Sequence, residues 1–271
     1  MERPNWAPAE VDINRPASSR IYDYMLGGAH NFAIDREVAE RAIAAMPQLP
    51  GVLRENRTFL RRVVRFLAGE AGVDQFLDLG SGIPTVGNVH EIAAEINPSA
   101  RIVYVDIDPV AVTHSQAILA GNPNAVAVQA DLRDPAMILA HPVVAGLLEL
   151  DRPVAVLLIA ALHFVPDWQH PGDILARLRT ALVPGSYLAI SHASEDGQPP
   201  AGQRDAQEVY ARADNAVLMR TRSEIAALID GWEPVEPGIV RCPLWRPDSD
   251  ETPPADAAQF PGYSVLARLA P

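Results

Sequence analysis

From Gln75 onward, short apolar runs alternate with stretches of helical periodicity, and this alternation limits the fold more than any other feature of the chain. It is typical of an α/β fold built from βαβ units, in which neighbouring strands run parallel and helices cover both faces of the sheet. We predict strands at residues 75–79, 102–106, 125–130, 153–160 and 186–192, with closing strands at 233–240 and 263–269. The predicted helices lie near residues 85–96, 110–120, 135–150, 171–182, 204–216 and 222–230.

The first 72 residues follow another pattern, and we expect residues 1–72 to form an arm and a helical cover over a core of residues 73–271. Residues 1–17 contain three prolines and show no periodicity, which predicts an extended arm. Periodicity then predicts three helices, from Ser18 to the Gly27-Gly28 pair, around 35–46, and around 52–68.

Apolar residues recur at helical spacing along the third of these helices, and we expect the stripe that they form to face the core. Asn56 and Arg57 fall inside this stripe. Because a buried arginine needs a carboxylate, either an internal ion pair or the carboxylate of a ligand would satisfy Arg57. Four other arginines lie off the stripe, and we expect them to be solvated: Arg54, Arg61, Arg62 and Arg65.

Composition excludes several classes of function. The formal net charge of −12 argues against binding to nucleic acid or to anionic membranes, because the field of the protein repels polyanions. All 22 basic residues are arginine, which excludes a lysine Schiff base and a Walker-type phosphate loop. The single Cys242 excludes an internal disulfide and a multi-cysteine metal site. The longest apolar run, residues 154–162, is too short to span a bilayer, so we expect a cytoplasmic protein.

The most informative segment joins the first predicted strand to the next helix. Asp78 lies in the strand, and Gly80, Ser81 and Gly82 follow it. Glycines in such a turn let the backbone approach a ligand closely, and the next helix begins with unpaired N–H donors. The second strand ends in Asp106, 24 residues beyond Gly82. A carboxylate at that position can accept hydrogen bonds from both ribose hydroxyls, so we predict a nucleoside site that includes the neighbouring Ile107.

Two cofactors fit this arrangement. A nicotinamide dinucleotide normally requires Gly-x-Gly-x-x-Gly, but Thr85 occupies the third glycine position. The carboxylate of Asp78 would repel a pyrophosphate, whereas it would attract the ammonium group of an amino acid. S-adenosylmethionine (SAM) combines such an ammonium with a ribose, an adenine and a sulfonium and carries no phosphate. The acidic residue therefore favours SAM over NAD, with a tight turn that binds no ligand as the third interpretation.

The ends of the third and fourth strands extend the predicted site. Asp131 can accept a hydrogen bond from the adenine amino group, and Leu132 offers a backbone N–H to the ring, although an Asp at such a place is often only a helix cap. Ala160 ends the fourth strand, where small residues leave room beside the methyl group for a substrate. We also place Tyr22 and Arg57 at the cofactor, with Arg57 meeting its carboxylate.

No side chain is singled out strongly as a catalytic base. His163, in the loop after the fourth strand, is either a base or an ordinary loop histidine. The other candidates near the expected opening are His30, Tyr22, Tyr24 and Asp167. Residues 22–31 either fold over the cofactor as a lid or form a helix C-cap.

At this point the sequence resembles a family of S-adenosyl methyltransferases that is common in high-GC bacteria and was formerly a domain of unknown function. The resemblance implies a class I methyltransferase core, Rossmann-like, with a seven-stranded, mostly parallel sheet and a reversed final hairpin. It also implies that Gly80, Gly82, Asp106 and Asp131 contact the cofactor. The chain departs from the family pattern at Ala29 and Ile107, where the family usually has Lys and Asn. The segments that carry the resemblance are RIYDYMLGGAHNF (20–32), ENRTFLRR (55–62), QFLDLGSGIPT (75–85), VYVDIDPV (103–110), ADLRDP (130–135), LHFVPD (162–167), PGSYLAISH (184–192) and EPGIVRCPLWRP (236–247).

Three functions follow as hypotheses. The first is a SAM-dependent methyltransferase that moves the methyl group to a small-molecule acceptor by in-line displacement, where alignment supplies much of the rate. The second is a SAM-binding sensor without catalysis, which needs the same pocket. The third is an NAD-dependent oxidoreductase, which predicts that NADH binds and SAM does not.

Overall fold

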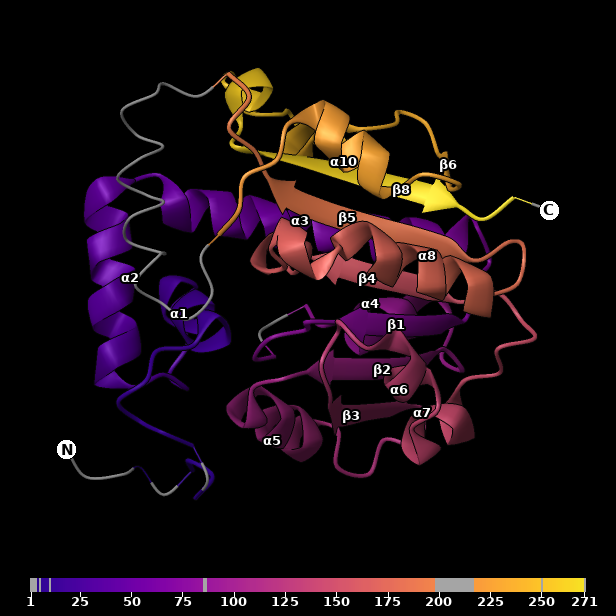
Figure 1. Cartoon of the computed structure of the whole chain (residues 1–271), viewed down its shortest axis with the longest axis horizontal. Helices are drawn as coiled ribbons and strands as arrows, with labels where there is room; N and C mark the ends of the chain where they lie inside the picture. Colours follow the sequence, from indigo (N-terminus) through magenta and orange to yellow (C-terminus); the bar gives the residue numbers. More distant parts are fainter. Residues whose placement is uncertain are drawn as a thin grey trace.

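The structure is a computed structural model that describes residues 4, 6–9, 11–84, 87–197, 217–249 and 251–270. Within these residues, eight strands form one sheet in the order β3-β2-β1-β4-β5-β8-β6, and β7 also pairs with β8 (Figure 1). The strands β1 to β5 run parallel, and the strands that pair with β8 run antiparallel to it. The strands are β1 Gln75–Leu79, β2 Arg101–Asp106, β3 Ala125–Gln129, β4 Ala155–Ile159, β5 Tyr187–Ala193, β6 Glu233–Pro234, β7 Val240–Arg241 and β8 Gly262–Arg268.

The parallel strands are apolar almost throughout because helices cover both faces of the sheet. Leu77 and Leu79 of β1 pack in one cluster with residues of α6, α7, α8 and α10, whereas Phe76 packs in the opposite cluster with α3 and α4. The prediction of an α/β fold is confirmed. The helices of the core are α4 Val89–Ile96, α5 Pro109–Ile118, α6 Pro135–Leu139, α7 Pro142–Leu147, α8 Pro171–Ala181 and α10 Arg222–Leu228.

The strand order reverses at β1, which pairs with β2 on one side and with β4 on the other. In an open parallel sheet, the connections that leave two such strands diverge to opposite faces and leave a crevice at their carboxyl ends. The helices α1 (Ser18–Met25) and α2 (Ala33–Ala45) lie beyond that edge of the sheet in Figure 1. The topology therefore opens a crevice between the strand ends and the N-terminal helices.

The N-terminal segment is joined to the sheet through α3 (Leu49–Gly69). Phe59, Val63, Val64 and Leu67 are fully buried in the same cluster as Phe76 of β1. The apolar stripe predicted in this helix thus faces the core. Residues on both sides of position 72 share one apolar core, and the division into a cover and a core at that position stays a prediction.

One expectation about this helix is wrong. Arg62 is only 5% exposed rather than solvated. Its guanidinium pairs with Glu55 at 3.0 Å and with Glu251 at 3.3 Å, and it donates a hydrogen bond to the Cys242 carbonyl at 2.8 Å. The C-terminal segment covers this side of α3, so the partners of Arg62 come mostly from far along the chain.

Two other elements differ from the sequence-based expectation. The helix expected at 135–150 is two helices, because Pro142 begins α7 and the side chain of His141 caps it by accepting from the Val143 N–H. The strand expected at 233–240 is split into β6 and β7, which makes the sheet eight-stranded rather than seven-stranded. Between them the chain turns at Gly238, whose φ is +80°.

The helix expected near 85–96 begins later than expected. This helix, α4, starts at Val89 after a capping box of Asn88 and Glu91. The helix expected at 204–216 lies outside the described residues. In the described part of the chain, we find no helix that has both the length and the apolar character needed to cross a membrane.

Candidate cofactor cleft and acceptor cavity

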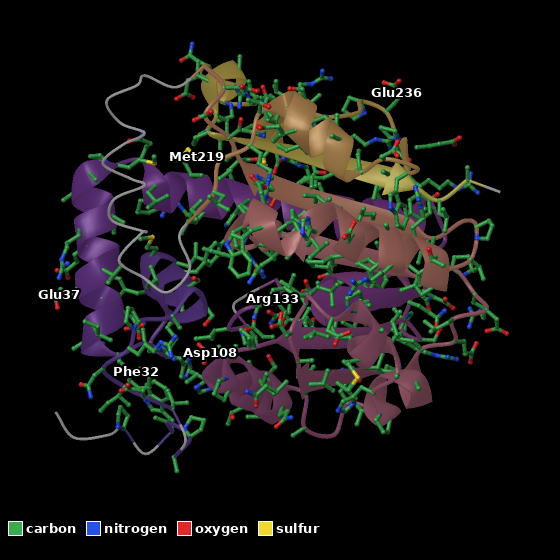
Figure 2. All side chains as sticks on the ribbon, in the orientation of Figure 1. Phe32, Glu37, Asp108, Arg133, Met219 and Glu236 are labelled. Carbon is green, nitrogen blue, oxygen red and sulfur yellow. The ribbon has the colours of Figure 1, made fainter. Side chains whose placement is uncertain are left out.

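A cleft of about 1230 Å³, partly open to solvent, occupies the crevice at the carboxyl ends of the parallel strands. The structure brings all of the residues predicted to bind the cofactor to the wall of this one cleft. Figure 2 labels Asp108 and Arg133, two further lining residues, on the side of the sheet that faces the N-terminal helices. The predicted residues are Tyr22, Arg57, Asp78, Gly80, Ser81, Gly82, Asp106, Ile107, Asp131, Leu132 and Ala160.

The glycine turn forms the floor of the cleft. Gly80 has a φ of +72° and Gly82 a φ of +68°, a region that favours glycine. The N–H groups of Gly80 and Ser81 both donate to the Val105 carbonyl, at 2.8 and 3.1 Å, which holds the turn against β2. A Cβ added to Gly80 would lie 2.7 Å from the Cβ of Ala161, so the turn packs without space for a side chain.

Asp106 ends β2 and connects the glycine turn to the next loop. Its Oδ2 accepts from the Gly82 N–H at 2.7 Å, and its Oδ1 accepts from the Asp108 N–H at 2.8 Å. Burial raises the pKa of Asp106 to about 6, against the effect of these backbone donors. Each carboxylate oxygen keeps a second lone pair, so the group can still accept from a ligand hydroxyl.

Asp78 has no such partners. The residue is 6% exposed, and in the part of the chain that the structure describes its carboxyl group receives no hydrogen bond. Burial raises its pKa to about 7, the positive charge of Arg57 lowers it, and the negative charge of Asp106 raises it. A buried carboxyl group without a donor fits a ligand that carries its own cation.

Within the described residues, Arg57 does not form the internal ion pair that is one of its two interpretations. Its Nη2 donates a hydrogen bond to the Gly87 carbonyl at 2.9 Å, and its side chain lines the cleft. The guanidinium is therefore free to meet an anionic group there.

Asp131 lies at the cleft but is already engaged by Arg133. The Nε of Arg133 donates to both carboxylate oxygens at 2.8 Å, and the Arg133 N–H donates to Oδ1 at 2.9 Å. Partial burial raises the pKa of Asp131, but the hydrogen bonds from Arg133 lower it more, so the net shift is downward. The helix cap of α6 is Asp134 rather than Asp131. Contact of Asp131 with adenine stays a prediction.

A buried polar network lies at the boundary between the cleft and a second cavity. Ala160 has a φ of +54°, and its N–H donates to the Ser191 hydroxyl at 2.9 Å. That hydroxyl donates to Asn56 Oδ1, and Asn56 Nδ2 donates to the Tyr22 hydroxyl at 3.0 Å. Tyr22 in turn donates to the Leu53 carbonyl at 3.2 Å. The role of Asn56 was not assigned from the sequence, although its place on an apolar stripe signalled an unusual environment.

The second cavity, called the acceptor cavity below, spans about 1000 Å³ and is partly open to solvent. It adjoins the cofactor cleft, with which it shares five lining residues: Ser18, Tyr22, Asn56, Ala160 and Phe164. Its other walls come from α1, α2, α3, the end of β5 and the segments around Met219 and Phe260. Most of these side chains are apolar.

His163 lines the acceptor cavity, but its geometry does not suit a base. The Ala193 N–H donates to His163 Nδ1 at 3.4 Å, which places the ring proton on Nε2. Burial, with the charges of His192 and Arg220, lowers the pKa of His163 well below 6.5. The ring is therefore neutral, and its lone pair is used within the protein.

The remaining base candidates are no better placed. The Tyr22 hydroxyl is held by Asn56 and Leu53, and burial raises its pKa. The prediction that His30 lies at the opening is wrong, because its ring lies against Trp6 and His114, with centroids 5.4 and 3.5 Å away. Its backbone N–H donates to Asp23 Oδ2 at 2.9 Å.

Two weaker candidates are also engaged elsewhere. Tyr24 donates to Glu40 at 3.0 Å, and Asp167, with its side chain 86% exposed, pairs with Arg220 at 2.6 Å. The segment at 22–31 contains a helix C-cap, since the Gly28 N–H donates to the Asp23 carbonyl at 2.8 Å.

Comparison with known proteins places this chain in a family. The family model described as S-adenosyl methyltransferase matches residues 4–270. The crystal structure of a candidate methyltransferase from Thermobifida fusca YX is 41% identical, with a TM-score of 0.92 over 99% of this chain and 100% of that one. A DUF574 family protein from Streptomyces avermitilis MA-4680 is 40% identical, with a TM-score of 0.90 over 96% of this chain and 100% of that one.

More distant structures share the fold alone. An O-methyltransferase family 2 protein from Planctomyces limnophilus DSM 3776 is 15% identical, with a TM-score of 0.52 over 88% of this chain and 67% of that one. No curated protein matches the sequence. The match over nearly the full length is decisive: the chain belongs to the S-adenosyl methyltransferase family, and it is a SAM-dependent methyltransferase with SAM as its cofactor.

Proposed function

We propose that the cleft binds SAM and that the methyl group passes to a small molecule in the acceptor cavity. The observation that supports this proposal is that the two spaces adjoin each other, with Tyr22, Asn56 and Ala160 lining both. When bound, SAM supplies a methyl group on a sulfonium that is already an excellent leaving group. The protein then has mainly to align the reactants for in-line displacement and to exclude water.

The residues of the cleft fit the cofactor group by group. Asp78, buried without a donor, would hold the ammonium group, and Arg57 would hold the carboxylate. Asp106 would accept from the ribose hydroxyls, while Asp131, Leu132 and Ile107 would surround the adenine. At Gly80 the turn leaves no space for a side chain, because a Cβ there would lie 2.7 Å from the Cβ of Ala161.

The cofactor's affinity should depend on pH. Asp78 has a pKa of about 7 in the free protein, so below pH 7 it carries a proton that an incoming ammonium group must displace. We expect the dissociation constant of S-adenosylhomocysteine (SAH) to rise about 20-fold between pH 7.5 and 5.5. Calorimetric titration at several pH values measures this slope, and D78N should bind weakly with a much flatter profile.

The raised pKa of Asp78 changes the stability of the free protein with pH in the opposite direction to the cofactor affinity. Because the folded state holds the Asp78 proton more tightly than the unfolded state, the contribution of Asp78 to stability is full near pH 4 and declines as the pH rises through about 7. In the titration, an SAH affinity that does not change between about pH 7.5 and 5.5 would contradict the contact between Asp78 and the ammonium group.

The role of Arg57 can be separated from general damage to the cleft. Arg57→Met should weaken SAH binding about 10- to 100-fold, because a charge-assisted hydrogen bond is lost. The affinity for 5′-methylthioadenosine, which lacks the amino-acid moiety, should stay unchanged, as should the melting temperature. Equal losses for both ligands would mean that Arg57 supports the cleft rather than the cofactor's carboxylate.

The proposed function is tested by titrating the protein with SAM and with NADH and by following SAH formation with a cell extract. We expect SAM to bind and NADH not to bind, and Asp106→Ala to weaken SAM binding about 10- to 100-fold. Tight SAM binding with no turnover in any extract would favour a sensor. Binding of NADH in place of SAM would overturn the assignment of the cleft.

A further inference from the structure

The described walls of the acceptor cavity carry no full charge. Among the residues that the structure describes in its lining, none is Asp, Glu, Lys or Arg. The two histidines of the lining are neutral, since His163 has a pKa well below 6.5 and burial lowers that of His192 to about 4. An ionised group placed against these walls would lose part of its hydration and would contact no opposite charge on the described lining.

The polar atoms of the lining are mostly occupied by each other. Ser191, Asn56 and Tyr22 form the network described above, which uses the hydroxyl groups and the amide within the protein. His192 Nδ1 bonds to the Ala193 carbonyl at 2.7 Å, and its Nε2 lies 2.8 Å from an Arg220 nitrogen that can only donate. Both ring nitrogens of His192 are thus engaged outside the cavity.

The free surface of the cavity is therefore apolar. Ile21, Met25 and Leu49 are buried, and Met46 and Leu53 complete the wall on the side of the N-terminal helices. Cys242, which also lines the cavity, stays a neutral thiol because burial raises its pKa to about 12. Such a wall stabilises a bound apolar ligand, because binding removes apolar surface from water.

From this lining we infer that the methyl acceptor is an uncharged, largely apolar small molecule, and that charged metabolites are rejected at the acceptor cavity. The inference rests on the proposed function, because it assigns the second cavity to the acceptor. The inference limits the acceptor to small molecules that can enter the cavity without a counter-ion.

Two fluorescent probes with the same aromatic skeleton test this selectivity. N-Phenyl-1-naphthylamine is neutral, and 8-anilinonaphthalene-1-sulfonate carries one negative charge; both brighten when they leave water. With saturating SAH present, we expect the neutral probe to bind at least about tenfold more tightly than the sulfonate. Equal or tighter binding of the sulfonate, or no binding of the neutral probe, would overturn the inference.

A matched pair of variants localises the probe. Met46→Asp places a carboxylate in the cavity wall, whereas Met137→Asp places one on α6, where Met137 is 67% exposed. The affinity for the neutral probe should fall about tenfold or more in Met46→Asp and stay unchanged in Met137→Asp. Equal affinities in the two variants would place the probe elsewhere and contradict the inference.

SAH affinity, measured on the same samples, distinguishes a failure of the inference about the acceptor from a failure of the proposed function. If SAH binds wild-type protein and Met46→Asp alike, the variant is folded and the probe result stands by itself. If SAH fails to bind wild-type protein, the proposed function fails, whatever the probes show. The preference between the two probes needs no variant, so it stays informative if Met46→Asp does not fold.

Discussion

Gly80→Val is expected to abolish cofactor binding, with an affinity loss of about 100-fold or more. The φ of Gly80 is +72°, which a β-branched residue rarely adopts, and a Cβ there would lie 2.7 Å from the Cβ of Ala161. Relief of that contact would push the turn into the space that we assign to the ligand. Calorimetric titration with SAH measures the effect.

Gly121→Val is the matched control for this change. Gly121 has a φ of +84°, but an added Cβ would meet nothing within 4 Å, and the residue is exposed in the turn after α5. This variant carries similar backbone strain outside the cleft and should retain wild-type affinity. If both variants bind SAH equally well, the turn at Gly80 does not approach a ligand.

The second large effect concerns stability. Arg20, only 4% exposed, pairs through Nε with Asp35 at 3.0 Å and through Nη1 with Asp108 at 3.3 Å. Arg20→Met would leave two buried carboxylates without their cation, which should lower the free energy of unfolding by about 3–5 kcal/mol. Chemical denaturation monitored by circular dichroism gives the value.

Arg41→Met supplies the comparison, because Arg41 pairs with Glu37 on the exposed face of α2, where the two side chains are 46% and 57% exposed. Its loss should change the free energy of unfolding by no more than about 0.5 kcal/mol. Similar destabilisation by the two substitutions would show that the ion pairs of Arg20 with Asp35 and Asp108 do not stabilise the packing of α1 and α2 on the loop after β2.

The core of the fold and the cofactor cleft could be predicted because their signals are local. Each parallel strand is a short apolar run, and acidic residues lie at or near the carboxyl ends of three of them, at Asp78, Asp106 and Asp131. The topology of an open parallel sheet then brings those ends together without further information. The predicted boundaries of the parallel strands agree with the structure to within two residues.

The errors arose where the decisive contacts are distant in the sequence. Nothing near Arg62 indicates that Glu251, 189 positions away, covers it. His30 looked free because its partners Trp6 and His114 belong to the arm and to α5. By contrast, the break before Pro142 had a local signal, since proline begins helices more readily than it continues them.

The acceptor cavity had no local signal either. Its walls come from three N-terminal helices, the end of β5 and two C-terminal segments, and most of the residues are apolar ones that would suit any core. Their shared property, the lack of charge around an open space, exists only after folding. Sequence reasoning identified Tyr22 and Ala160 at its boundary but not the cavity itself.

The most direct test of the account is a crystal structure of the complex with SAH. We predict that the ribose hydroxyls lie within hydrogen-bond distance of Asp106, that the amino group lies at Asp78, and that the sulfur faces the acceptor cavity beside Ala160. A nucleoside bound elsewhere, or a sulfur atom turned away from that cavity, would contradict the central claim.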